Sequence, residues 1–151
     1  MHKPIQNQHR YRRLRIFSTL AGILWALPWS LFGLALALPI RILDGHIYRV
    51  AGNVPALLVR GPLAELLLMR HPFGPMAAMA IGHVIIARHD LTPRTLAHEL
   101  AHVRQAARWG PVFPFAYLAA SAWALLHGHQ AYWHNHFEIA ARKAEQHSTH
   151  I

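Results

Sequence analysis

The chain has 151 residues, no cysteine, and 15 Lys and Arg against 6 Asp and Glu, which gives a formal net charge of +9. This length fits one domain. The absence of cysteine excludes a disulfide framework and a thiolate metal site, and it leaves the cellular compartment open. A strongly basic balance is typical of proteins that meet anionic lipid surfaces or nucleic acid.

The N-terminal part of the chain joins a basic tail to an uncharged apolar run. Residues 1–15 are polar and basic, whereas residues 16–40 carry no charged side chain. As one helix, residues 16–40 would be about 37 Å long, enough to cross the hydrocarbon core of a bilayer. We therefore expect a transmembrane helix. Because Pro28 should kink it, two short arms dipping into one leaflet are an alternative, and a buried core helix is another.

The distribution of positive charge predicts an orientation. The basic tail precedes the apolar run, and the arginines after it are sparser. This asymmetry predicts a cytoplasmic N-terminus in an inner membrane. A single span would place residues 41–151, the expected folded domain, on the other side, whereas a re-entrant loop would leave them in the cytoplasm.

Three short apolar runs at 54–60, 65–70 and 76–88 follow, separated by Gly, Pro and His. Their composition and spacing predict strands of a small, mostly antiparallel sheet. The leucines of the first two runs would also suit a helix. The run 76–88, which holds Ile81 and Ile86, is the clearest strand, and it leads directly toward the next motif.

A helix is predicted from Thr92 to Gly110. Thr92 is a good N-cap and Pro93 fits the first helical position. Gly110 is a typical C-terminal residue, and Pro111 should prevent the helix from continuing. Apolar residues recur at spacings of three and four along this stretch, so one side of the helix should pack against the core.

The same helix contains an HExxH motif, His98 to His102. Two histidines one helical turn apart project on the same side and can hold one Zn²⁺. Glu99 lies beside them and can take a proton from a metal-bound water. Gln105 falls on the same face, where it can support a ligand. Two solvated histidines on a surface helix are the alternative.

The segment 111–126 is apolar and helix-prone beyond Pro114. It is shorter than the ~20 residues that a transmembrane helix needs. It also separates the HExxH motif from the next candidate ligand, which must lie on the same side of the membrane. We therefore expect a packed helix or one that rests in the membrane interface.

The C-terminal segment is helical from about Ala131 and places Glu138 within an apolar stripe that includes Trp133 and Phe137. A buried carboxylate is costly unless it is paired or bound to a metal. Glu138 is therefore a candidate third ligand. The alternative is an exposed ion pair with Arg142, four residues further on.

The two motifs HELAHVRQ and NHFEIAAR together resemble the gluzincin branch of the zincin metallopeptidases, especially its small single-domain members. The wider pattern resembles a group of bacterial membrane-associated proteins. The resemblance covers about residues 76–145. It implies an α+β zincin-like fold, zinc ligands His98, His102 and Glu138, and Glu99 as general base. It further implies that the strand 76–88 is an edge strand along which an extended peptide or protein substrate lies.

One position departs from the gluzincin pattern. Arg142 stands where many gluzincins carry an Asp that orients the first histidine ligand. The partner that fixes a metal-bound histidine must then come from elsewhere, and Asp90, Gln105 or a backbone carbonyl are the candidates.

If the site is intact, the oxyanion formed during hydrolysis needs a hydrogen-bond donor. Candidate donors shortly before Glu138 are Tyr132, His134 and His136. Two other functions fit parts of the sequence. The histidine cluster 127–136 is also typical of a catalytically inactive metal-binding membrane protein, such as a sensor or an assembly factor. A nucleic-acid-binding module is not expected, because the basic block adjoins the apolar run and lipid phosphates explain it more simply.

Overall fold

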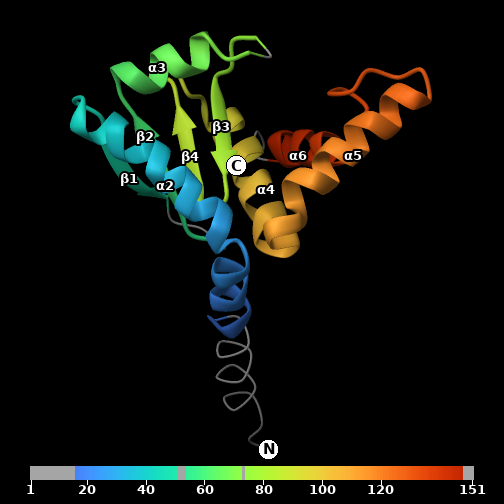
Figure 1. Cartoon of the computed structure of the whole chain (residues 1–151), viewed down its shortest axis with the longest axis horizontal. Coiled ribbons are helices and arrows are strands. Elements are labelled where there is room, and N and C mark those ends of the chain that lie inside the picture. The colour runs from blue at the N-terminus through green and yellow to red at the C-terminus, as the bar shows by residue number, and fades with distance from the viewer. Residues whose placement is uncertain (1–15, 51–53, 73, 148–151) are drawn as a thin grey trace, which may run out of the picture.

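The computed structural model describes residues 16–50, 54–72 and 74–147. Over these ranges the chain is an α+β fold with a small mixed sheet (Figure 1). The elements are α2 (Leu27–Ile42), β1 (His46–Val50), β2 (Ala56–Arg60), α3 (Pro62–Met69), β3 (Ala78–Ile81), β4 (Val84–Ala87), α4 (Pro93–Trp109), the 3-10 turn η1 (Gly110–Val112), α5 (Phe113–Leu126) and α6 (His136–His147). A further helical segment, Ile16–Trp25, precedes α2. The basic tail 1–15 lies outside the described residues.

The four strands of the sheet follow the order β1-β2-β4-β3. β1 and β3 pair antiparallel with their neighbours, whereas β2 and β4 are parallel. The predicted strand at 54–60 is confirmed as β2. The strand β1 was not predicted, and it pairs with β2 from His46 opposite Arg60 to Val50 opposite Ala56.

The prediction of a strand at 65–70 is wrong, because Pro62–Met69 forms helix α3. Pro62 occupies the first turn, where its missing N–H costs nothing. Leucine, alanine, glutamate and methionine all favour a helix. Ala64 and Leu68, one turn apart, are both buried in the core that lies under α2. Burial of one helical stripe therefore decided between the two conformations that these leucines allow.

The predicted single strand at 76–88 is instead a hairpin. β3 and β4 pair antiparallel, with Ile81 opposite Val84. The two-residue turn contains Gly82 at a φ of 59°, in the left-handed region that favours glycine. A Cβ on Gly82 would also lie 2.4 Å from the backbone nitrogen of Ser30. The first half of the run, β3, is an edge strand, whereas β4 lies inside the sheet.

The apolar run 16–40 is bent by 68° between Ile16–Trp25 and Leu27–Ile42, with Pro28 in the first turn of α2. The predicted kink is thus confirmed. One side of α2 covers the sheet, with Gly33, Ala37 and Ile40 buried. The other side is exposed and apolar along its length. A buried core helix was one of the alternatives for this run. One side of α2 agrees with that alternative, whereas its other side is an exposed apolar face.

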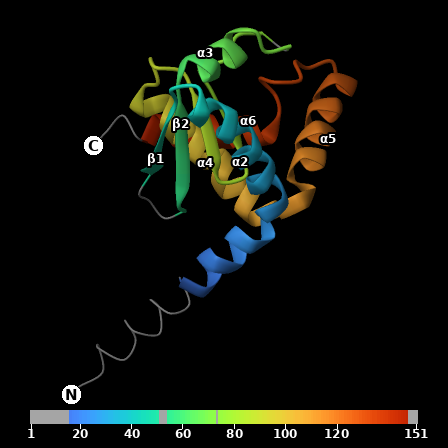
Figure 2. The ribbon, with the colours of Figure 1, turned by 60° about the vertical axis from the view of Figure 1, so that its left-hand side comes forward.

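Helix α4 packs against the opposite face of the sheet, where Val103 is fully buried in a cluster with Leu58 and Ile85. The chain turns at η1, where the indole Nε1 of Trp29 donates a hydrogen bond to the Pro111 carbonyl, 3.0 Å away. From this turn α5 projects away from the sheet as a separate arm, visible in both views (Figures 1 and 2).

The part of the chain that the structure describes contains one continuous helical stretch, Pro93–Leu126, that is long and apolar enough to cross a membrane. The bent pair Ile16–Trp25 and Leu27–Ile42 passes the same test when its two arms are taken together. Length and composition alone carry this result, and the core helix of a soluble protein can pass the same test.

Candidate metal centre

Helix α4 presents the HExxH motif as the sequence predicts. Thr92 caps the helix, because its side chain accepts a hydrogen bond from the backbone N–H of Thr95. Gly110 ends the helix with a φ of 57°. Both bounds agree with the prediction. His98 and Glu99 are buried and His102 is half-buried, so the motif faces the interior between α4 and α6.

Helix α6 brings Glu138 to the two histidines. Asn135 fixes the start of this helix, since its Oδ1 accepts a hydrogen bond from the backbone N–H of Phe137 at 2.9 Å. Its Nδ2 donates to the Tyr117 carbonyl and to the Ser121 hydroxyl on α5. Asn135 is fully buried, and it therefore ties the first turn of α6 to the α5 arm.

His98, His102 and Glu138 form a compact group that could hold a metal ion. The two Nε2 atoms of the histidines lie 3.0 Å apart. Glu138 places Oε2 at 3.2 Å from His98 Nε2 and Oε1 at 3.2 Å from His102 Nε2. Ligand atoms of a tetrahedral zinc site are separated by roughly 3.3 Å, given metal–ligand distances near 2.0 Å. The spacing of the two histidine nitrogens fits this geometry, and each Glu138 oxygen lies at a similar spacing from one of them.

The state of the polar atoms also fits a cation. Glu138 is 3% exposed, and its Oε2 has no well-aligned hydrogen bond despite the nearby His98. Burial alone would raise the pKa of Glu138, but the neighbouring His102 and His98 side chains, together with the hydrogen bond from Tyr117, outweigh it and hold that pKa well below its usual range. The lowered pKa of Glu138 favours the ionised carboxylate, which is the form that binds a metal ion.

Glu99 lies beside this group without belonging to it. Its carboxylate is close enough to interact electrostatically with His102, His98 and Glu138, and it accepts a hydrogen bond from the backbone N–H of Ala80 on β3. Burial raises the pKa of Glu99, and the neighbouring His102 and His98 offset part of this increase. Glu99 therefore sits between the candidate ligands and the edge strand of the sheet.

The side chain that accompanies His98 was not predicted from the sequence. Nδ1 of His98 lies 3.3 Å from Oε1 of Glu145, although the two are not aligned as a regular hydrogen bond. Glu145 follows Glu138 by two helical turns, so both carboxylates face α4. Arg94 approaches the other Glu145 oxygen at 3.4 Å. The spacing of seven residues within α6 was the signal in the sequence that could have found Glu145.

Gln105 supports the second histidine, the kind of role that its position on the α4 face suggested. Its Oε1 lies 2.8 Å from Nδ1 of His102, and its Nε2 donates to the Phe137 carbonyl at 2.9 Å. With Gln105 Oε1 as acceptor, the proton of His102 would lie on Nδ1 and the lone pair of Nε2 would be available to a bound metal. Gln105 thus links the orientation of His102 to the position of α6.

Two aromatic groups and one arginine surround Glu138. Tyr117 on α5, another residue missed from the sequence, donates a hydrogen bond to Glu138 Oε1 at 2.8 Å. Tyr132 also lies near this carboxylate, and burial together with the charge of Glu138 raises its pKa to about 12. Arg142 stacks on Trp133 and brings its NH1 to 4.0 Å from Glu138 Oε2, where that NH1 has no hydrogen-bond partner.

Three of the predicted supporting residues lie elsewhere. Asp90 forms an ion pair with Arg88 at the end of β4. His134 accepts a hydrogen bond from the Gln130 backbone and stacks on His129, and the ring of His136 contacts that of Phe137 at a tilted angle. Both histidines are exposed. Of the three candidate oxyanion donors, Tyr132 is the one that the structure brings next to Glu138.

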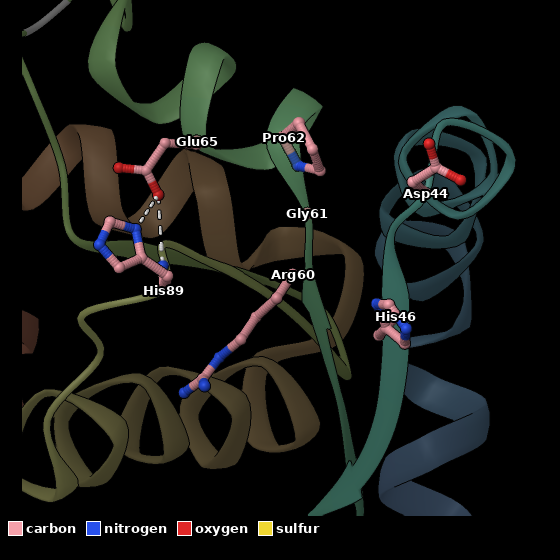
Figure 3. A pocket seen from close by; sticks show the side chains of 7 residues that line it. All are labelled: Asp44, His46, Arg60, Gly61, Pro62, Glu65 and His89. Atoms are coloured by element: carbon pink, nitrogen blue, oxygen red, sulfur yellow. Dashed lines mark hydrogen bonds and ion pairs between the residues drawn. The ribbon is translucent and has the colours of Figure 1, made fainter.

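A separate hollow of about 390 Å³ lies away from this group, between the end of β2 and the start of α3. It is lined by Asp44, His46, Arg60, Gly61, Pro62, Glu65 and His89. Its charged side chains do not converge on one point (Figure 3): Glu65 and His89 bind each other at 3.0 Å, whereas no interaction is drawn from Arg60 to either of them. The candidate metal ligands therefore lie between α4 and α6 and not in this hollow.

Comparison with known proteins adds no relative to this description. No protein-family profile matches the chain, and neither a curated protein nor a solved structure is significantly similar to it.

Proposed function

We propose that the protein is a membrane-anchored, zinc-dependent metallopeptidase of the gluzincin type. The observation that carries this proposal is the convergence of His98, His102 and Glu138, with Glu99 beside them on the same helix. Two imidazoles and one carboxylate are the ligand set of several catalytic zinc sites and leave one coordination position open.

Each residue of the site has a separate role in the proposed hydrolysis. Zinc held by the three side chains would polarise the substrate carbonyl and lower the pKa of a water molecule toward neutrality. Glu99 would accept the proton of the attacking water and deliver it to the leaving amine. Tyr132, which lies near Glu138, would donate a hydrogen bond to the developing oxyanion. Gln105 and Glu145 hold the two imidazoles in orientation.

The edge strand β3 supports a peptide as substrate. Among the described strands β3 lies at one end of the sheet, and its residue Ala80 is next to Glu99. An extended peptide can add to such an edge through backbone hydrogen bonds. A peptide bound in this way would pass over the general base.

The apolar N-terminal helices support the membrane anchor. Ile16–Trp25 and Leu27–Ile42 together have the length and composition of a membrane segment. Large apolar side chains on both arms are exposed, including Phe17 at 74%, Leu24 at 68% and Ile42 at 69%. Lipid contact would cover these side chains, whose exposure to water is otherwise unfavourable.

The substitution Glu99→Gln tests the peptidase. It keeps the size of the side chain but removes the base, so hydrolysis of a peptide library should fall by about 10²–10⁴-fold. Zinc content should stay as in the wild type, because Glu99 is not a ligand. The matched control Glu65→Gln removes a carboxylate far from the site and should leave hydrolysis unchanged.

The ligands are tested separately by metal analysis of the purified protein. The wild type should contain about one zinc per chain. The His98→Ala, His102→Ala double variant should contain none. Normal hydrolysis by Glu99→Gln would refute Glu99 as the general base, whereas a zinc-loaded wild type that hydrolyses no peptide would leave an inactive metal-binding membrane protein. Undiminished zinc in the double variant would remove the metal site as well.

A further inference from the structure

Helix α5 carries a continuous apolar face that no described element covers. The exposed side chains include Phe115 at 67%, Leu118 at 64%, Trp123 at 66% and Leu126 at 82%. Their spacing of three to five residues places them on one side of the helix. The chain has no charged side chain from Trp109 to Phe137. An apolar face of this size on a projecting arm requires a partner.

The opposite face of α5 packs against the candidate metal centre. Tyr117 binds Glu138, and Ser121 binds Asn135. Ala124 is buried on the same side. Only one side of α5 is therefore free, so lipid cannot surround the helix as it surrounds a transmembrane span.

Length leads to the same conclusion. The 14 residues of α5 give a helix of about 21 Å, whereas a bilayer core is about 30 Å thick. α5 by itself is therefore too short to span the bilayer, and its single free side can contact only one leaflet. A lipid membrane explains this face better than a second copy of the chain does, because the exposed Arg104 and Arg108 that precede α5 can bind lipid phosphates.

Exposed arginines precede α5 in the chain, and exposed aromatic side chains follow it. Arg104 and Arg108, one turn apart, are exposed on α4 just before η1, from which α5 starts. After α5 in the sequence, Tyr132 and Trp133 are exposed at 48% and 57%, and they lie near Glu138 and Arg142. Arginine attracts anionic phosphates, and Tyr and Trp favour the boundary between headgroups and chains.

We propose that α5 lies in the plane of one leaflet of an anionic lipid membrane, with its Phe115–Leu126 face against the acyl chains. This contact is separate from the N-terminal helices. Since Tyr117 spans from α5 to Glu138, the metal centre lies about one helix diameter, ~10 Å, from the lipid. If the proposed peptidase function holds, its substrates are peptide bonds at the membrane surface.

The test uses the absence of cysteine from the chain. Single cysteines replace Leu118 and Leu126 on the apolar face, Leu24 on the N-terminal helix, and Tyr48 on β1 as an exposed control away from the proposed contact. Each full-length variant carries an environment-sensitive fluorophore on its cysteine. The proteins are reconstituted into vesicles of phosphatidylcholine and phosphatidylglycerol in equal parts, with and without phospholipids that carry a spin label on the acyl chain.

We expect the spin-labelled lipid to quench the fluorophores at Leu118 and Leu126 strongly and to leave Tyr48 bright. Quenching at Leu24 without quenching at Leu118 and Leu126 would overturn the proposal while the N-terminal anchor stands. Fluorescence at Leu118 that depends on protein concentration and not on spin-labelled lipid would assign the face to a second copy, and this result would also overturn it. Zinc content and circular dichroism of each variant show that it is folded, and they are independent of hydrolysis.

Discussion

The carboxylate of Glu145 should control how tightly the site holds zinc. Its Oε1 lies 3.3 Å from Nδ1 of His98, and the two side chains are 19% and 8% exposed. A carboxylate beside the distal nitrogen fixes the imidazole orientation and raises its basicity, which makes the other nitrogen a better ligand. Because both groups are largely shielded from water, solvent should not replace this support.

Loss of such a partner typically costs about 10- to 100-fold in metal affinity, or ~1.4 to 2.7 kcal/mol. Glu145→Gln keeps an oxygen that can accept the His98 proton, so we expect a loss near tenfold. Glu145→Ala removes the acceptor and should approach 100-fold. The zinc affinity is measured by competition with a chromophoric chelator at fixed pH, on detergent-solubilised full-length protein.

Two control variants separate this effect from general loss of charge. Glu65→Gln changes a carboxylate bound to Arg88 and His89 and should leave the zinc affinity unaltered. Arg94→Ala removes the exposed partner of Glu145 and should change the affinity less than Glu145→Gln, since exposed ion pairs contribute little. Wild-type zinc affinity in Glu145→Ala would show that His98 does not depend on this carboxylate.

Three further predictions concern the orientation of His102 by Gln105, the turn at Gly82, and the membrane anchor at residues 16–40. Gln105→Ala should lower zinc affinity about tenfold, read in the same competition assay, and an unchanged affinity would mean that His102 is oriented by another group. Gly82→Ala should lower the unfolding temperature in detergent far more than Gly128→Ala, because both have positive φ but only a Cβ on Gly82 meets the backbone of Ser30; equal effects would contradict the close contact. The full chain should stay in the membrane fraction through a carbonate wash, and its release would show that residues 16–40 do not anchor it.

The sequence determined the features that depend on neighbouring residues. The bounds of α4 follow from Thr92 and Gly110, because caps act within one turn. The pairing of His98 with His102 follows from helical spacing alone. The bend near Pro28 was also predictable, since proline cannot continue a helix without distortion.

The tertiary structure decided what depends on which surfaces are buried. Hydropathy is the same for a core helix and a membrane helix, so only packing showed that Gly33 and Ala37 of α2 cover the sheet. The leucines of α3 suit a strand or a helix, and burial of Ala64 and Leu68 selected the helix.

The support of the metal centre was likewise decided by folding. Tyr117 lies 21 residues from Glu138 in sequence, and contact between them depends on how α5 and α6 return to α4. Glu145 could face His98 only once the rotation of α6 was set, and Asn135 and Glu138 set that rotation through contacts with α5 and α4. Ligand spacing is a local property of one helix, whereas the orientation of each ligand depends on contacts between helices that only the folded chain brings together.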